Sequence, residues 1–388
     1  MMRETADVVI VGGGVMGCSL QYHLARQGAT RTLLLERRVL GAGSTGLSQA
    51  ICRMHYSNPI TASMAWDSLQ VYANFAEQVG GDSGFHRTGY LVVVEEIDRN
   101  GLELNIAMQQ ELGINVGLVT ASELGDLAPM METYEGEGLA WEPDSGYANP
   151  YLVTNSYAER SRELGAQIAT RVAATGVEIS GGRVQAVLTE QGRVATGAAV
   201  VAAGPWANSL MSGTGVEFPL VPVRHQVALA TRPTGVLPAH PIVGDIAQSF
   251  SFRPESPALT MIGFAEDEVG LDNYDEGIDK AEAEDALERL VRRMPAMKDS
   301  YLRGGWSGLF TTTPDWHPIL DRVPGIDGLY CMVGFSGHGF KLAPAIGQAM
   351  SELVLEGRAT SIDLSPLRFS RFDEGDWLSS RYRYRVLA

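Results

Sequence analysis

The chain has 388 residues, 45% of them hydrophobic, which is long enough for two domains with buried cores. Its 46 acidic residues outnumber 30 basic ones, and the net charge of −16 argues against nucleic-acid or anionic-membrane partners, since both bind positive surfaces. The three cysteines, Cys18, Cys52 and Cys331, show neither metal-ligand spacing nor a paired framework, which predicts reduced thiols and no metal site.

No targeting or anchoring segment is expected. The first predicted strand begins within ten residues of Met1, which leaves no room for a secretory signal. No apolar run approaches the roughly 20 residues of a transmembrane helix. We therefore expect a cytoplasmic protein without a transmembrane segment, and either a homo-oligomer or a hetero-oligomer is compatible with the sequence.

The opening stretch, ADVVIVGGGVMG, is an apolar run followed by Gly12, Gly14 and Gly17 in the spacing G-x-G-x-x-G. A helix predicted over 18–27 completes a strand, turn and helix. In such a unit the first glycine permits the turn, the second lets backbone N–H groups approach a pyrophosphate, and the third lets the helix pack on the strand. The helix N-terminus also favours phosphates. The stretch therefore predicts a dinucleotide site.

A second strand is predicted over 32–35 and leads into Glu36, nineteen residues after Gly17. An acidic residue at this distance binds the two ribose hydroxyls of an adenine dinucleotide. Glu36 would repel a 2′-phosphate, which disfavours NADP, although Arg37 beside it keeps that alternative open. This unit alone does not distinguish NAD from FAD.

The middle of the chain alternates between helical and β-type periodicity. The glycine-rich residues 41–46 predict a loop over 37–47. Taken in order, the elements predicted after that loop are a helix over 59–80, a strand over 89–94, helices over 102–112 and 121–127, the latter capped by Ser122, a strand over 138–141, a helix over 150–164, a β-rich meander over 167–202, strands over 224–231 and 259–264, and an amphipathic helix over 279–294.

Two further glycine-rich turns follow predicted strands. The strand over 198–202 runs into Gly204, Pro205 and Trp206, which predicts either close approach to a ligand or a tight turn into a helix. The strand over 328–333 runs into the sequence GFSGHGFK at 334–341, and a helix is predicted over 342–355. The chain thus ends on a second strand-to-helix turn rich in glycine.

Four motifs together make the chain resemble the FAD-dependent amine and amino-acid oxidoreductases of the D-amino-acid oxidase superfamily, in the branch of sarcosine oxidase and its β subunits, glycine oxidase and proline dehydrogenase β subunits. They are VVIVGGGVMG with Glu36, GAGSTG followed by ICRMHYSNP, VVAAGPWA, and GFSGHGFKLAP. The resemblance implies an α/β fold. It has a discontinuous Rossmann-like FAD-binding domain (1–84, 143–221 and 304–388) and a mainly antiparallel-sheet substrate domain (85–142 and 222–303).

The resemblance also implies oxidation of a small amino acid or N-methyl amino acid, such as sarcosine, glycine or proline, to the imine by hydride transfer to FAD. Arg53 and Lys341 would bind the substrate carboxylate, and His338 would orient the substrate or affect its protonation. From the residues alone, a surface salt bridge for Arg53, a solvated helix start for Lys341 and a structural role for His338 are simpler alternatives. The residues expected to contact FAD are Gly12, Gly14, Val15, Met16, Gly17, Glu36, Arg37, Ser44, Thr45, Ser48, Val172, Ala203, Gly204, Trp206, Gly308, Gly334, Gly337, Gly339, Phe340 and Lys341.

The sequence differs at two places from the family that it resembles. No cysteine occurs in the stretch 306–310 and no histidine in GAGSTG, so FAD is expected to be bound noncovalently. Met261 falls where an oxygen-activating lysine is found in monomeric sarcosine oxidase, and a thioether cannot stabilise superoxide. This favours a dehydrogenase that passes electrons to a partner protein or quinone, with O2 as the other acceptor.

Two other classes remain as alternatives. An aromatic-type flavin hydroxylase shares the first motif but carries a Gly-Asp pair near the closing turn, where this chain has Gly334 and Phe335. A noncatalytic flavoprotein subunit is disfavoured by the presence of both Arg53 and Lys341. For the substrate's side chain, the sequence suggests a pocket with Phe250, Phe252 and Phe264.

Overall fold

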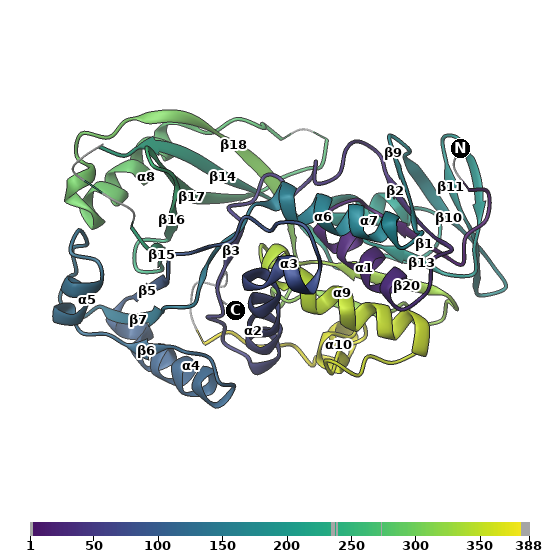
Figure 1. Cartoon of the computed structure of the whole chain (residues 1–388), viewed down its shortest axis with the longest axis horizontal. Helices are drawn as coiled ribbons and strands as arrows, with labels where there is room; N and C mark the ends of the chain where they lie inside the picture. Colours follow the sequence, from purple (N-terminus) through teal and green to yellow (C-terminus); the bar gives the residue numbers. More distant parts are fainter. Residues whose placement is uncertain (1–2, 234–236, 238–239, 273, 382–388) are drawn as a thin grey trace.

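The structure is a computed structural model that describes residues 3–233, 237, 240–272 and 274–381. Figure 1 shows two groups of elements side by side: an eight-stranded sheet with helices α4, α5 and α8 on the left, and a six-stranded sheet with helices α1, α6 and α9 on the right. Both groups draw on distant parts of the chain. In the described part of the chain, none of the helices has the length and apolar character that crossing a membrane requires.

The six-stranded sheet has the order β19-β20-β13-β1-β2-β9. All neighbouring strands are parallel except β19, which pairs antiparallel with β20. This is the Rossmann-like arrangement, assembled from the beginning, middle and end of the chain. Its strands are β1 (Val8–Val11), β2 (Thr32–Glu36), β9 (Gln167–Thr170), β13 (Ala199–Val201), β19 (Ile319–Arg322) and β20 (Leu329–Val333).

This sheet is buried on both faces. Side chains alternate across a strand, so Val8 and Ile10 belong to one core cluster and Val9 and Val11 to another. The first cluster includes the helices α1 (Val15–Arg26), α6 (Pro150–Glu163) and α9 (Gly339–Glu356). The second includes a three-stranded sheet of β10 (Ala174–Ser180), β11 (Arg183–Thr189) and β12 (Gly192–Ala195). Burial on both faces explains why β1 reads as an unbroken apolar run.

The eight-stranded sheet has the order β18-β14-β17-β16-β15-β5-β7-β6, and its pairings are antiparallel except for β15 with β5. The predicted fold class is therefore confirmed. Its strands are β5 (Tyr90–Val94), β6 (Gly117–Leu118), β7 (Gly138–Glu142), β14 (Val221–Thr231), β15 (Ile242–Asp245), β16 (Phe250–Ser256), β17 (Leu259–Glu268) and β18 (Leu302–Thr312). The domain boundaries stay a prediction, and β14 and β18 each continue across one of them, at 221/222 and 303/304.

Shorter elements complete the described part of the chain. A small sheet pairs β8 with β3 and β4, and α2 begins after Asn58, whose side chain accepts a hydrogen bond from the Thr61 N–H at 3.0 Å. The remaining elements are β3 (Ile51–Cys52), α2 (Pro59–Ala73), α3 (Phe75–Gln78), β4 (His86–Arg87), α4 (Arg99–Glu111), α5 (Ala121–Leu127), β8 (Gly146–Tyr147), α7 (Ala207–Leu210), α8 (Lys280–Arg293) and α10 (Arg371–Glu374), with single 3-10 turns at Glu96–Asp98, Gly204–Trp206, Pro295–Met297 and Ser365–Leu367.

Several predicted boundaries are wrong, for local reasons. Ser122 lies inside α5, and Thr120 caps it instead: the Thr120 hydroxyl accepts from the Glu123 N–H at 3.2 Å while Glu123 accepts from the Thr120 N–H at 2.7 Å. Helices α1 and α9 start three residues before the predicted positions, because the glycine-rich turns are themselves the first turns of the helices. The predicted helix over 59–80 is interrupted at Asn74.

The three cysteines are buried and free. Burial raises the pKa of the Cys18 and Cys52 thiols to about 12, so both are neutral at physiological pH. Cys18 and Cys331 pack in the two core clusters on either face of the six-stranded sheet.

Replacing Gly17 tests whether the close packing of α1 against the first glycine turn is needed for stability. A Cβ at Gly17 would overlap the backbone carbonyl oxygen of Gly12, so Gly17→Ala is expected to destabilise the protein by about 1–3 kcal/mol and to weaken FAD binding. Thermal unfolding and flavin titration measure both effects. Gly125→Ala in α5, where a Cβ would meet open space, is the matched control and is expected to be neutral or stabilising. Unchanged stability and FAD affinity in Gly17→Ala would contradict this account of the turn.

Candidate active site

A cavity of about 610 Å³ lies at the carboxyl ends of β1, β2 and β13 and extends to the eight-stranded sheet. This is where open α/β sheets place their ligands, and the volume is within the roughly 300–1,000 Å³ typical of small-molecule and cofactor sites. Each of the four sequence motifs contributes lining residues. The cavity therefore gathers segments that are far apart in the chain.

The first glycine turn forms one end of the cavity, and its backbone packs directly against the backbone at the end of β13. Gly12 has φ +122°, a conformation that favours glycine, and a Cβ there would overlap the carbonyl oxygen of Ala202 at the end of β13. Gly12 and Gly14 line the cavity, whereas Gly17 does not and instead packs α1 against the turn. These are the separate roles that the motif predicts for its three glycines.

Glu36 and Arg37 lie beside this turn. The Glu36 carboxylate accepts hydrogen bonds from the Gly13 N–H at 2.8 Å and from the Arg38 N–H at 2.7 Å, which fixes it at the end of β2. The Arg37 guanidinium lies 3.7 Å from the centre of the Trp206 ring in a cation–π contact. All of these residues line the cavity, so a carboxylate, a guanidinium and an indole face one end of it.

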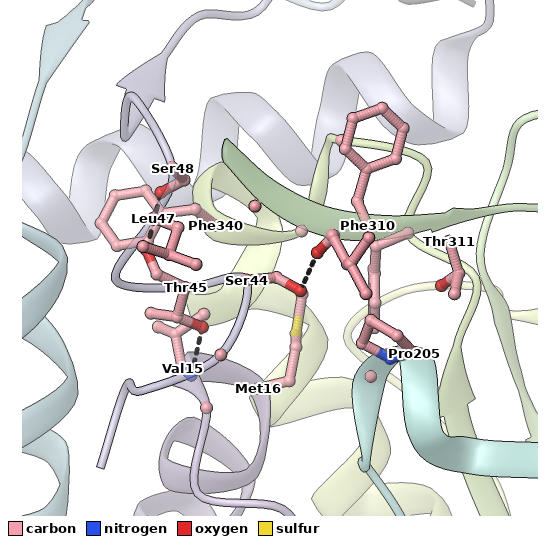
Figure 2. Close-up of a pocket in the computed structure, with 18 of the residues that line it drawn as sticks. Val15, Met16, Ser44, Thr45, Leu47, Ser48, Pro205, Phe310, Thr311 and Phe340 are labelled. Atoms are coloured by element: carbon pink, nitrogen blue, oxygen red, sulfur yellow. Dashed lines mark hydrogen bonds between the residues drawn. The ribbon is translucent and has the colours of Figure 1, made fainter. Parts of the chain in front are cut away.

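The loop after β2 connects α1 to the eight-stranded sheet, as Figure 2 shows. The Thr45 hydroxyl accepts a hydrogen bond from the Val15 N–H at 3.1 Å, at the start of α1. Ser48 donates to the Thr45 carbonyl at 2.8 Å, and Ser44 donates to the carbonyl of Leu309 on β18. The loop is therefore held from both sides of the cavity.

Two cations face the other end of the cavity. Arg53 is 5% exposed and Lys341 is 7% exposed, so neither the surface salt bridge nor the solvated helix start is correct. The Arg53 guanidinium lies 4.4 Å from the Tyr56 ring centre and 5.9 Å from that of Tyr90, and it donates to the His55 carbonyl. Burial, together with the Arg53 charge, holds the pKa of Lys341 well below its ordinary value. Two buried basic side chains therefore line this end of the cavity.

His338 is buried behind this end and does not line the cavity. Its Nδ1 lies 3.4 Å from the Tyr56 hydroxyl, and the two rings meet edge to face with centres 5.3 Å apart. Burial and the charges of Lys341 and Arg53 hold the pKa of His338 well below its ordinary value, so the imidazole is neutral. Its role toward a substrate remains a prediction, and Tyr56 is the side chain through which it could act on Arg53.

Most of the predicted site residues meet at this cavity. Val172 does not line it: its N–H donates to the Glu36 carbonyl at 3.0 Å, and Ala174 and Thr175 line the wall nearby. Gly334 is displaced from the lining because it packs against Thr313. The predicted residues that line the cavity are Gly12, Gly14, Val15, Met16, Glu36, Arg37, Ser44, Thr45, Ser48, Arg53, Ala203, Gly204, Trp206, Gly308, Gly337, Gly339, Phe340 and Lys341.

The wall formed by the eight-stranded sheet contains polar residues that sequence reasoning missed. His225 on β14 and Glu266 on β17 are cross-strand partners, with 3.5 Å between Nδ1 and Oε1, and both line the cavity. Ser251 on β16 donates to the Gln49 side chain at 2.8 Å, and both of these residues line it too. A histidine within the predicted strand 224–231 was the available signal. The sequence does not show which face of that strand it occupies.

The suggested aromatic pocket is only partly correct. Phe250 lines the cavity, whereas Phe252 and Phe264 are buried in the core that packs α8 on the sheet. Met261 is also buried outside the cavity lining, between Leu229 and Arg253 on the neighbouring strands. The cavity lining therefore includes one of the three expected rings.

The residues present fit a flavin adenine dinucleotide. A glycine turn that a Cβ would block, the start of α1 and an acidic residue at the end of β2 suit its adenosine and pyrophosphate. The cavity then continues to the second glycine turn, where Gly337 and Gly339 leave room for a planar ring. A cavity that ended at Trp206 would be long enough for a mononucleotide only. This cavity continues beyond Trp206 to Gly337 and Gly339.

Comparisons with known proteins agree with this fit. A family model described as FAD dependent oxidoreductase matches residues 7–353. The chain is 30% identical to FAD-dependent oxidoreductase domain-containing protein 1 of Bos taurus, over 96% of this chain and 86% of that protein. It is 25% identical to the mitochondrial sarcosine dehydrogenase of Mus musculus, over 98% of this chain but only 43% of that protein, so the chain spans less than half of that relative.

Among solved structures, the L-proline dehydrogenase from P. horikoshii superposes with a TM-score of 0.89 at 25% identity, over 97% of this chain and 100% of that chain. The family match extends over most of the sequence, and the motifs that carry it are those that line the cavity. The chain therefore belongs to the FAD-dependent oxidoreductase family of the D-amino-acid oxidase superfamily, and its cofactor is FAD.

Proposed function

We propose that this enzyme oxidises a small amino acid or N-methyl amino acid, such as sarcosine, glycine or proline, to the imine, with FAD bound noncovalently. The observation that carries the proposal is the pair of buried cations, Arg53 and Lys341, at one end of the FAD cavity. A substrate carboxylate would bind there strongly, because charge-assisted hydrogen bonds gain strength where water is excluded. Sarcosine dehydrogenase and L-proline dehydrogenase among the relatives support this substrate class.

Bound FAD would supply the hydride acceptor, which no amino-acid side chain can provide. The protein's part is to bind and orient the substrate. The Arg53 guanidinium is restrained by the Tyr56 and Tyr90 rings and by the His55 carbonyl, so its planar fork is preorganised for a carboxylate. Lys341 adds a point charge from the first turn of α9. The substrate's carboxylate would thus be fixed by two different elements.

The substrate amine must also lose a proton, because an ammonium group has no lone pair to form the imine. We infer that His225 accepts this proton, since it lines the cavity and Glu266 lies 3.5 Å from its Nδ1. Glu266 would stabilise the imidazolium once it forms. The pair lies on the adjacent strands β14 and β17 of the eight-stranded sheet.

The electron acceptor is a separate proposal. A partner protein or a quinone is favoured over O2 because the resemblance puts a neutral side chain, Met261, where an oxygen-activating lysine would lie. Met261 itself is buried outside the cavity lining, so this preference rests on the resemblance and not on a contact with the cavity. Anaerobic reduction of the bound flavin by sarcosine, glycine, proline and D-amino acids tests the substrate class, and reoxidation rates with O2 and a quinone test the acceptor. Failure of all of these amino acids to bleach the flavin would overturn the proposed function.

Replacing either cation is expected to weaken substrate carboxylate binding while FAD stays bound. Truncating one partner of a buried charge pair costs about 2–5 kcal/mol, so Arg53→Met and Lys341→Met should each raise the dissociation constant by about 30-fold or more. Flavin absorption changes on titration measure this. Arg193→Met and Lys280→Met, which replace exposed cations, are matched controls. Substrate affinity equal to that of the controls would remove the substrate assignment.

Carboxylate binding is expected to be coupled to proton uptake at Lys341. The depressed pKa means that the ligand-free lysine loses its proton at a lower pH than usual, and an adjacent carboxylate raises that pKa. The affinity for a redox-inert carboxylate such as acetate should therefore fall as pH rises through the ligand-free pKa. Titration of the enzyme at several pH values measures the slope. In Lys341→Met the part of the slope that belongs to the lysine should disappear, and a slope identical to wild type would contradict the prediction.

His225→Gln and Glu266→Gln are expected to slow flavin reduction far more than they weaken substrate binding. The defect should shrink at alkaline pH, because more of the amine then loses its proton to solvent before binding. Rapid-mixing flavin reduction separates the rate from the dissociation constant. Ser251→Ala, at another polar residue of the same wall, is the comparison variant. A defect of equal size at all pH values would rule out the proton-acceptor role.

A further inference from the structure

Arg371, in the short helix α10, is fully buried and uses its guanidinium in a bidentate ion pair. Its Nε donates to Asp315 Oδ2 at 2.8 Å and its Nη2 donates to Asp315 Oδ1 at 2.9 Å. The remaining donors bind the carbonyls of His317 at 2.8 Å and Arg368 at 3.0 Å. Arg371 does not line the cavity, and the proposed chemistry does not use it.

Asp315 is also hydrogen-bonded to other residues of its own loop, 313–317. Its Oδ1 also accepts from the His317 N–H and from the Thr313 hydroxyl, each at 3.1 Å. Burial alone would raise the pKa of Asp315, but the Arg371 guanidinium holds that pKa below its ordinary value. The carboxylate is therefore ionised, and it shares the single Thr313 hydroxyl proton with the His317 carbonyl, whose oxygen lies 2.7 Å from Thr313 Oγ1.

Thr313 in turn contacts the closing glycine turn. Its N–H donates to the Ser336 hydroxyl at 3.3 Å, and the Ser336 N–H donates to the Thr311 carbonyl at 2.8 Å. The Thr313 methyl group occupies the space that a Cβ at Gly334 would need. An unbroken series of contacts thus leads from α10 through the 313–317 loop to the turn that precedes α9.

The turn needs such a restraint because its backbone is strained. Gly334, Ser336 and Gly337 have φ values of +71°, +46° and +81°. Ser336 is the costly member, since residues other than glycine rarely adopt this region and persist there when their surroundings hold them. The same turn leads into Gly339 and Lys341, which line the cavity.

We infer that Arg371 is a positioning residue for the active site: through Asp315 and Thr313 it holds the strained turn that places Lys341 and the Gly337–Gly339 backbone in the FAD cavity. The effect on FAD rests on family membership. Only the effect on a substrate carboxylate rests on the proposed function.

The structure offers a matched comparison in Arg293. This arginine is also fully buried, and it donates to Asp245 at 2.8 Å and to Glu137 at 2.6 Å. Its partners belong to the eight-stranded sheet and the loop before β7, and none of the three lines the cavity. An arginine that only stabilises the fold should therefore behave like Arg293.

The experiment compares Arg371→Met with Arg293→Met in the full chain. Both are expected to lower the unfolding temperature. Only Arg371→Met is expected to raise the FAD dissociation constant, by tenfold or more, to shift the absorption spectrum of bound flavin, and to speed hydrogen exchange over 334–341 in the FAD-free protein. Arg293→Met should stay within twofold of wild type in FAD affinity.

A milder variant covers the case in which Arg371→Met does not fold. Ser336→Ala removes the hydroxyl that Thr313 contacts and leaves the ion pair intact, and it should change FAD affinity and exchange in the same direction. Arg371→Lys, which keeps the charge without the planar fork, should recover part of the FAD affinity. Wild-type FAD affinity and exchange in Arg371→Met, or in Ser336→Ala if the first does not fold, would overturn the inference. FAD affinity needs no substrate, so these outcomes stand apart from the test of the amino-acid substrate.

Discussion

Two basic side chains share one end of a buried cavity, and much of the surrounding structure serves to keep them there. Both side chains are largely withdrawn from water, and burial together with the Arg53 charge disfavours the protonated form of Lys341. Neither side chain can escape: two aromatic rings restrain Arg53, and Lys341 belongs to the buried first turn of α9. The buried Glu142 carboxylate lies 3.6 Å from His55, the residue whose carbonyl accepts from Arg53. This restraint of both side chains is what supports the proposal of a carboxylate site.

The glycine motifs could be predicted because their function is local. Gly17 is required by a contact within a single strand, turn and helix, and the φ of +122° at Gly12 is a local property of the same turn, so their spacing carries the information; the contact of Gly12 with Ala202 on β13 is not local and only the structure shows it. The identity of the cofactor needed more, since only the cavity that joins Gly12 to Gly337 explains a ligand longer than a mononucleotide. The family resemblance provided that connection before the structure did.

The eight-stranded wall could not be predicted in the same way. Which side of β14 faces the cavity depends on its register with β17, and that register shifts between His225 and Gln226. Alternation along the strand therefore gives no reliable assignment of faces. His225 and Glu266 become neighbours only through this pairing, forty-one positions apart in the sequence. Val172 and His338 were expected to line the cavity, and they lie beside it instead. A difference of a few ångströms in side-chain position decides whether a residue lines a cavity or packs behind its wall, and the sequence does not determine positions that closely.

The loop between β2 and β3 links the two groups of elements across the cavity. It is hydrogen-bonded to α1 through Thr45 and to β18 through Ser44, and the Trp306 indole of β18 donates to its Leu47 carbonyl at 2.9 Å. A ligand that filled the cavity would contact both groups of elements at once, because the lining residues come from both, and its binding free energy would add to the work of separating them. Bound FAD would thus act as a structural linker as well as a reagent. Loss of the cofactor would therefore weaken the contact between the two sheets before it destabilised the core of either sheet.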